Sequence, residues 1–273
     1  MDDPVCEPRL QNDKPIKDFE ILACERTTMV ERTVLVTGAS KGVGKEIALA
    51  LANAGHRVVV NYRTDETGAE AVVEEVLKRG HKADLLQADV TVPSQVESMI
   101  DEIIRGHGRL DALINNAGIY RDSTVWKMPP ETWHDVLNVN LTATFLCAKA
   151  AIPHMRSQGW GRIINISSVV GQTGFFGTSN YAAAKAGVFG FTKTVAKEVA
   201  KFGITVNCLC LGYFGLGMFL RLPDHIQKQI IEQIPLGRPG SSNELTAPVL
   251  FLFSEDASYI TGQIIHVNGG CFM

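Results

Sequence analysis

From residue 32 to the C-terminus, short segments rich in β-branched residues alternate with amphipathic segments of helical length. Strands that alternate with helices are joined by βαβ crossovers and form a parallel sheet. The run Val58-Val59-Val60 is apolar throughout, as expected of a strand covered by helices on both faces. The expected strands are 33–37, 57–61, 83–88, 110–114, 162–167, 205–209 and 263–267. The expected helices are 43–54, 65–79, 93–106, 131–157, 179–202, 224–233 and 242–254.

No repeat or linker interrupts this alternation. We therefore expect an α/β fold, in which residues 29–273 form a single doubly wound Rossmann domain with a seven-stranded parallel sheet flanked by helices. Residues 1–28 differ from the rest, because they hold three prolines, mixed charges and only one short apolar cluster. This composition favours a flexible N-terminal extension. The alternative is a segment that docks on a partner or a neighbouring subunit.

The overall composition is that of a soluble globular protein, with 45% hydrophobic and 20% charged residues and a net charge of −3. A chain of 273 residues can bury a large core without metals or disulfides. The charge balance lacks the basic excess of a nucleic-acid-binding surface. The six cysteines form no CxxC pair and no cluster with zinc-ligand spacing. No secretory signal is evident, and no uncharged apolar run reaches the ~18–20 residues of a membrane span. We expect a cytoplasmic protein without a metal, nucleic acid or membrane partner.

The first expected strand runs directly into the loop TGASKGVG, and a helix follows at once. Glycines in such a loop let the backbone turn tightly and approach a phosphate, and the helix N-terminus offers N–H groups and a partial positive charge. An ordinary βα turn is the alternative, but the position at the head of a βαβ series favours a dinucleotide-binding loop. The loop residues expected to contact the cofactor are Gly38, Ser40, Lys41, Gly42, Val43 and Gly44.

The second expected strand ends in Asn61-Tyr62-Arg63, without the acidic residue that usually binds the ribose 2′-hydroxyl of NAD. Arg63 offers a guanidinium for a 2′-phosphate, and Lys41 offers a second cation. Each side chain alone would be read as a solvated surface charge. Together they favour NADP, so we expect NADPH as the cofactor.

Further cofactor contacts are expected after the third and fourth strands, at the carboxyl edge of the sheet. Asp89 can accept a hydrogen bond from the adenine amino group, although a helix N-cap is the alternative role for this residue. Small residues at this edge would let the backbone pass close to the cofactor. The expected contacts are Asp89, Val90, Asn116, Ala117 and Gly118.

Tyr181 and Lys185 lie four residues apart in the alanine-rich segment YAAAK, so they share one helix face. A tyrosine is a poor acid at neutral pH, and a nearby ammonium group should lower its pKa. Such a pair is suited to protonate the alkoxide that forms from a ketone. Ser168, at the end of the preceding strand, can hold the carbonyl oxygen. A YxxxK pair alone is more often a helix-surface pair, but the order of strand, serine and helix favours catalysis here.

The motifs TGASKGVG, NNAG at 115–118, NVNL at 138–141, Ser168 and YAAAK resemble those of the short-chain dehydrogenase/reductase superfamily, from Arg32 to the C-terminus. The resemblance implies catalytic roles for Asn140, Ser168, Tyr181 and Lys185. It implies that Asn140 kinks a helix and holds a water that relays protons to Lys185, and that Lys185 also binds the nicotinamide ribose. It further implies that Lys41 and Arg63 select NADP.

Within this superfamily the chain is most similar to 3-oxoacyl-carrier-protein and acetoacetyl-CoA reductases. The segments that carry this similarity are GWGRIINISSVVG, YAAAKAGVFGFTKTVAKEVAKFGITVN, QIPLGRPG and YITGQIIHVNGG. The resemblance implies NADPH-dependent reduction of a β-ketoacyl thioester in fatty acid biosynthesis, with an acyl carrier protein or CoA as the carrier. It also implies a homotetramer.

Two features depart from the family pattern. The sixth strand is normally followed by Pro-Gly and a nicotinamide-binding threonine, and these positions hold Leu211, Gly212 and Leu216. The missing hydroxyl removes a hydrogen bond worth on the order of 1 kcal/mol. We still expect cofactor contacts from Gly212 and Phe214. The basic residues that carrier-protein reductases place before the fifth strand and after the tyrosine helix are replaced by Gly159 and Phe202, with Arg156 and Lys201 close by.

The apolar, glycine-containing stretch 212–220 is expected to form a mobile lid over the substrate, opposite two phenylalanines. Such a lid would suit an apolar β-ketoacyl group. The alternative is that these side chains pack a helix pair or a subunit contact. The expected lid residues are Phe175, Phe176, Tyr213, Leu216, Met218 and Phe219.

Two other functions remain open on the sequence. A short-chain dehydrogenase acting on a sugar, steroid or small diketone would carry the same motifs. A non-catalytic dinucleotide-binding protein would explain the changes at Leu211 and Leu216, although the complete Asn-Ser-Tyr-Lys set argues against it.

Overall fold

Seven parallel strands form one sheet at the centre of the fold, in the order β3-β2-β1-β4-β5-β6-β7. We describe a computed structural model for residues 30–217 and 219–273, so the predicted N-terminal extension lies outside the described residues. The strands are β1 (Thr33–Val36), β2 (Arg57–Tyr62), β3 (Ala83–Gln87), β4 (Ala112–Asn115), β5 (Gly161–Ser168), β6 (Ile204–Leu211) and β7 (Ile264–Val267). The order reverses between β1 and β4, which is where doubly wound sheets bind ligands. The predicted seven-stranded parallel sheet is confirmed.

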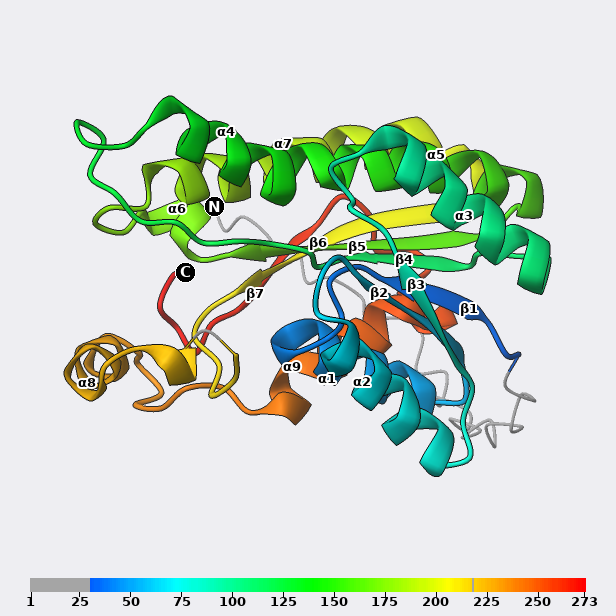
Figure 1. The fold of residues 1–273 in the computed structure, drawn as a ribbon, viewed down its shortest axis with the longest axis horizontal. Coiled ribbons are helices and arrows are strands. Elements are labelled where there is room, and N and C mark those ends of the chain that lie inside the picture. The colour runs from blue at the N-terminus through cyan, green and yellow to red at the C-terminus, as the bar shows by residue number, and fades with distance from the viewer. Residues whose placement is uncertain (1–29, 218) are drawn as a thin grey trace, which may run out of the picture. The chain divides into compact units, whose positions relative to one another are not determined.

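Helices cover both faces of this sheet (Figure 1). One face packs against α1 (Gly42–Asn53), α2 (Glu66–Lys78) and α9 (Ser242–Phe253). The other packs against α3 (Pro93–His107), α5 (Ala143–Gln158) and α7 (Ser179–Val199). Alternate residues of a strand point to opposite faces, so Val34 and Val36 enter the first core and Leu35 the second. Both faces are dry, which explains the continuously apolar strands.

The segment expected to be one helix over 131–157 is an α-helix of two parts joined by a π turn. It comprises α4 (Pro130–Leu137), a π turn over Asn138–Thr142 and α5. By length and composition alone, Pro130–Gln158 is apolar enough to cross a membrane. Its apolar side chains, including Cys147 and Met155, enter the second core. These buried side chains account for part of the apolar character of the segment, while Phe145 on the same helix is exposed.

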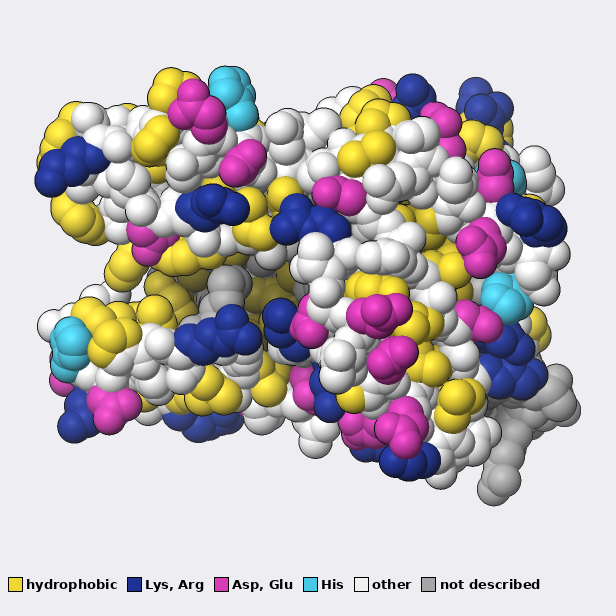
Figure 2. Space-filling view, viewed as in Figure 1, with side chains coloured by type: hydrophobic (Ala, Val, Ile, Leu, Met, Phe, Trp, Pro, Cys, Tyr) yellow, Lys and Arg dark blue, Asp and Glu magenta, His cyan; other side chains and the backbone are white. Residues whose placement is uncertain are grey.

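One short helix was not expected, and one expected helix lies apart from the sheet. The short helix α6 (Val170–Thr173) follows β5 directly and was not predicted, because four residues carry no periodic signal. The helix α8 (Asp224–Glu232) was predicted, and it lies apart from the sheet with its own cluster of Phe219, Ile230 and Ile234. Figure 2 shows an open hollow, lined largely by hydrophobic side chains, between α8 and the end of the molecule that carries α4, α6 and α7.

Candidate active site

The glycine loop connects β1 to α1 at the carboxyl edge of the sheet, as predicted. Gly38 and Gly42 have φ values of 61° and 57°, which favour glycine. A Cβ built on Gly38 would lie 2.9 Å from the Cα of Ala117, and one on Gly44 would lie 2.5 Å from Nδ2 of Asn116. The loop therefore packs directly on the Asn116-Ala117 segment, and only glycine fits.

Hydrogen bonds fix this contact. The Asn116 side chain donates to the carbonyl oxygens of Thr37 and Gly38, at 2.9 and 3.0 Å. The Thr37 hydroxyl accepts from the N–H groups of Asn116 and Ala117, at 3.0 and 3.1 Å. Asn61, at the end of β2, accepts from the Gly38 N–H at 3.2 Å. No role was predicted for Thr37 or Asn61. A polar residue at the buried end of an apolar strand is the signal that would have found them.

The loop has the form of a phosphate cradle. Lys41 is the N-cap of α1, and the first-turn N–H groups that follow have no partner within the helix. A helix N-terminus behind a glycine turn binds phosphate. Gly217, from the expected lid segment, approaches so closely that its Cβ would lie 3.4 Å from the Cα of Gly42. The residues present fit a dinucleotide, and Gly38 to Gly44 would hold its pyrophosphate.

Both cations expected to hold a 2′-phosphate lie at this edge, and each faces a carboxylate. The Lys41 ammonium is 2.5 Å from Oδ2 of Asp65, and the Arg63 guanidinium is 3.7 Å from Oδ2 of Asp89. The other oxygen of Asp89 accepts from the N–H and the hydroxyl of Thr91. The N-cap of α3 is Val92, so Asp89 orders the loop after β3 and caps no helix. Val90 is buried beside Ala117 and Asn115, beneath the same loop.

Two elements bring Ser168, Tyr181 and Lys185 together. Ser168 is the last residue of β5, and α7 begins at Ser179. The Ser167 hydroxyl donates to the Lys185 carbonyl oxygen at 2.8 Å, and the Lys185 ammonium donates to the Ile166 carbonyl oxygen at 2.9 Å. These bonds lock α7 to β5. The Lys185 Nζ lies 5.6 Å from the centre of the Tyr181 ring.

Burial decides the protonation of this pair. Burial raises the pKa of Tyr181 to about 12, against a hydrogen bond with Ser168 that lowers it and a neighbouring Tyr213 that raises it. Burial lowers the pKa of Lys185 to about 8. That Lys185 lowers the pKa of the phenol stays a prediction, because the side chains that shift the pKa of Tyr181 here are Ser168, Tyr213 and Cys210.

Asn140 lies in the π turn and is 1% exposed. Its side chain accepts from the Ile119 N–H at 3.0 Å and donates to the Ile119 carbonyl oxygen at 2.8 Å. A Cβ on Gly118 would lie 2.7 Å from Oδ1 of Asn140 and 3.8 Å from Nζ of Lys185. Asn140, Gly118 and Lys185 are thus neighbours. The helix is irregular at this asparagine, as the family resemblance implied, and the side chain anchors the loop after β4.

Tyr120 is an aromatic neighbour of Tyr181 that the sequence analysis missed. The two ring centres are 5.2 Å apart with an interplanar angle of 80°, an edge-to-face contact. Burial, with the nearby Asp122 carboxyl, raises the pKa of Tyr120. The Tyr120 ring is therefore neutral and packs against the predicted proton donor, Tyr181. Its position two residues after Gly118, the last residue of the NNAG motif, is the sequence signal that could have identified it.

The predicted lid residues divide into buried and exposed groups. Phe219 is buried against the α8 cluster, and Tyr213 packs beside it with ring centres 6.2 Å apart. Phe175 and Phe176 are 45% and 79% exposed. Leu216 lies against the first core, and Met218 lies outside the described residues. The described lid residues follow the carboxyl ends of β5 and β6, at the end of the sheet where the predicted catalytic residue Ser168 lies, and the mobility of this segment stays a prediction.

Backbone pairing holds the end of β6 and the segment that follows it. Leu211 pairs with Ser168 on β5 and with Val267 on β7, so the strand continues to this residue. The Gly212 N–H donates to the Val267 carbonyl oxygen at 2.9 Å, and a Cβ at Gly212 would lie 2.6 Å from the Cα of Asn268. Phe214 is buried and pairs with Gly240. The chain at Leu211, Gly212 and Phe214 is thus fixed by its backbone contacts with β5, β7 and Gly240.

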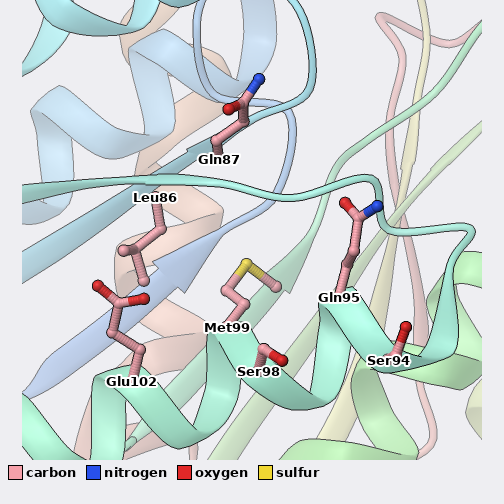
Figure 3. Close-up of a pocket in the computed structure, with 7 residues that line it drawn as sticks. All are labelled: Leu86, Gln87, Ser94, Gln95, Ser98, Met99 and Glu102. Carbon is pink, nitrogen blue, oxygen red and sulfur yellow. The ribbon is translucent and has the colours of Figure 1, made fainter.

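A separate surface hollow lies between β3 and α3 (Figure 3). Leu86 and Met99 form its apolar part, and Gln87 points away from α3. β3 is the outermost strand, and three strands separate it from β5 in the sheet. The hollow contains none of the predicted catalytic residues. Among residues 30–217 and 219–273, no group of three metal-ligating side chains is present.

The parallel sheet, the glycine loop and the Ser-Tyr-Lys set define a dinucleotide-dependent oxidoreductase of the short-chain dehydrogenase/reductase class. The chain belongs to this family, since residues 38–271 match the family described as enoyl-(acyl carrier protein) reductase.

Three relatives carry a more specific description, 3-oxoacyl-[acyl-carrier-protein] reductase. The protein of Staphylococcus aureus strain N315 is 47% identical over 242 residues, which is 89% of this chain and 98% of the relative. The protein of Synechocystis is 46% identical over 248 residues, 90% of this chain and 99% of the relative. The protein of Escherichia coli K12 is 43% identical over 242 residues, which is 89% of this chain and 98% of the relative.

Proposed function

We propose that this protein reduces a β-ketoacyl thioester to the 3-hydroxyacyl thioester, with NADPH as the reductant. The observation that carries the proposal is the convergence of Ser168, Tyr181 and Lys185 beside the Asn116 to Gly118 segment that supports the glycine loop. The full-length similarity to 3-oxoacyl-[acyl-carrier-protein] reductases supports the substrate class. The cations Lys41 and Arg63 at the edge of the loop support NADPH.

The chemistry follows from the position of each group. When bound, NADPH supplies a hydride to the carbonyl carbon. The Ser168 hydroxyl orients the carbonyl oxygen beside Tyr181. Because burial raises the pKa of Tyr181 to about 12, the phenol is protonated at neutral pH and can donate its proton to the oxygen as negative charge develops there. Lys185, with its pKa lowered to about 8, carries a proton that can restore the phenol.

The test is turnover with an acetoacetyl thioester, followed by the loss of NADPH absorbance. Tyr181→Phe should lower kcat by about 10²–10⁴-fold, since it removes the proton donor and keeps the ring. Tyr259→Phe is the matched control, because Tyr259 is 99% exposed and should leave kcat unchanged. Full turnover by Tyr181→Phe would contradict the assigned acid. Tight NADPH binding without turnover of any ketone would favour a non-catalytic dinucleotide-binding protein.

The carrier and the competing ketone substrates are separated by the same assay. Acetoacetyl-CoA and an acetoacetyl carrier protein should both be reduced. The carrier whose thioester gives the higher kcat/KM is then identified as the natural one. A sugar, steroid or small diketone reduced with a higher kcat/KM than either thioester would favour the alternative dehydrogenase. A panel of acyl groups tests the predicted lid, because indifference to acyl length would contradict a fitted apolar cover.

We also propose that the protein is a cytoplasmic homotetramer. Several large apolar side chains on α5, α9 and the C-terminal segment are exposed in the single chain, including Phe145, Phe251 and Met273. Phe145 and Phe251 lie on helices that cover opposite faces of the sheet, so they support subunit contacts on two sides of the chain. The four cysteines of the described residues are free thiols, consistent with a reducing compartment. Sedimentation velocity would measure the assembly, and a monomer at micromolar concentration would contradict it.

A further inference from the structure

The carboxylate of Asp65 lies where the groups expected to hold a 2′-phosphate meet. Its Oδ2 accepts from the Ser40 hydroxyl at 3.0 Å and from the Lys41 ammonium at 2.5 Å. A Cβ on Gly68 would lie 2.8 Å from Oδ1, so the carboxylate also rests against the first turn of α2. Asp65 is the N-cap residue of that helix.

These neighbours form an anion seat. A hydroxyl, an ammonium group and a helix N-terminus are the donors that proteins use to hold phosphate. Here the chain's own carboxylate fills the seat. Arg63, the second cation expected at the 2′ position, faces Asp89 in the same way. Both charges that would attract a 2′-phosphate are therefore balanced by carboxylates before any nucleotide arrives.

We propose that Asp65 is a selectivity-determining residue that opposes the 2′-phosphate of the cofactor. The inference rests on the proposed dinucleotide site. A 2′-phosphate engages Lys41 only after the Asp65 carboxylate has moved away, and the two anions then repel each other. An unphosphorylated ribose requires no such movement, because its hydroxyl can donate to the carboxylate in place. Asp65 thus narrows the preference for NADPH over NADH.

The charge of Asp65 persists under working conditions. Hydrogen bonds from Lys41 and then Ser40 lower the pKa of the carboxyl, so it is ionised at neutral pH. The side chain is 34% exposed and Lys41 is 60% exposed, so the pair can open without unpacking the core. The effect of Asp65 on the affinity for a 2′-phosphate is accordingly moderate, because exposed ion pairs are weak.

The test is calorimetric titration of the full chain with adenosine 2′,5′-bisphosphate and with adenosine 5′-monophosphate. Asp65→Asn keeps the shape and a good N-cap residue but removes the charge. It should tighten binding of the bisphosphate about 5- to 10-fold, the range expected for charges in a solvated site, and change binding of the monophosphate less than about 2-fold.

Two further variants make the result specific. Glu66→Gln removes a charge one residue away, where the carboxylate accepts from the Tyr62 hydroxyl and not from Lys41, and it should change neither affinity by more than about 2-fold. Lys41→Met should weaken binding of the bisphosphate and leave binding of the monophosphate unchanged, since it removes the cation of the anion seat.

Weaker binding of the bisphosphate by Asp65→Asn would overturn the inference, because the carboxylate would then serve to position Lys41. Equal changes for both ligands, or an equal effect of Glu66→Gln, would overturn it as well. If the wild-type protein binds neither nucleotide, the inference and the proposed dinucleotide site fail together. The titration involves no ketone, so a protein that binds both nucleotides but reduces no thioester refutes the proposed reaction alone.

Discussion

Replacing Asn140 by alanine should destabilise the fold and misplace the loop beside the catalytic tyrosine. The buried side chain makes two hydrogen bonds to the backbone of Ile119, at 3.0 and 2.8 Å. Alanine would leave an N–H and a carbonyl oxygen without these partners, and each such loss costs about 1–1.5 kcal/mol where some water can reach the group. The expected loss in the free energy of unfolding is about 2–3 kcal/mol. For a domain of this size, that lowers Tm by roughly 4–12 °C.

Thermal unfolding of the cofactor-free protein measures this loss, and Asn138→Ala is the matched control. Asn138 begins the same π turn and is exposed, so its removal should change stability by no more than about 0.5 kcal/mol. Asn140→Ala should also reduce turnover, because Ile119 precedes Tyr120, whose ring packs against Tyr181. Equal Tm values for the two alanine variants would refute the view that Asn140 anchors the loop.

Two further predictions concern Lys185 and Gly38. Burial lowers the pKa of Lys185 to about 8, so folding disfavours its charged form. The unfolded state then binds more protons between pH 8 and 10.5, and the contribution of Lys185 to stability rises with pH across that window, by on the order of 3 kcal/mol. The difference in unfolding free energy between wild type and Lys185→Met should show this rise in urea titrations, and a constant difference would contradict it. Gly38→Ala should destabilise the fold and abolish nucleotide binding, because its Cβ would lie 2.9 Å from the Cα of Ala117 at a φ of 61°. Calorimetric titration with the nucleotide tests this, and nucleotide binding by Gly38→Ala would contradict the prediction.

Two kinds of feature could not be predicted from the sequence pattern: the π turn and the contacts between residues far apart in the chain. The helix expected over 131–157 exists, but its π turn at Asn138–Thr142 leaves no mark on the apolar periodicity. The turn is stabilised where Asn140 meets Ile119, 21 residues earlier in the chain. The contact between Asn116 and Thr37 spans 79 residues. Sequence spacing cannot reveal such pairs.

Local patterns were enough to determine the order of strands and helices, the glycine loop and the shared helix face of Tyr181 and Lys185. Each depends on residues close together in the chain, because period, turn geometry and helix spacing act over a few residues. The protonation of Tyr181, the carboxylate partners of Lys41 and Arg63, and the aromatic wall at Tyr120 were decided by the tertiary structure. Burial and through-space charge depend on which distant segments pack together, and that is settled only when the sheet and its helices have assembled.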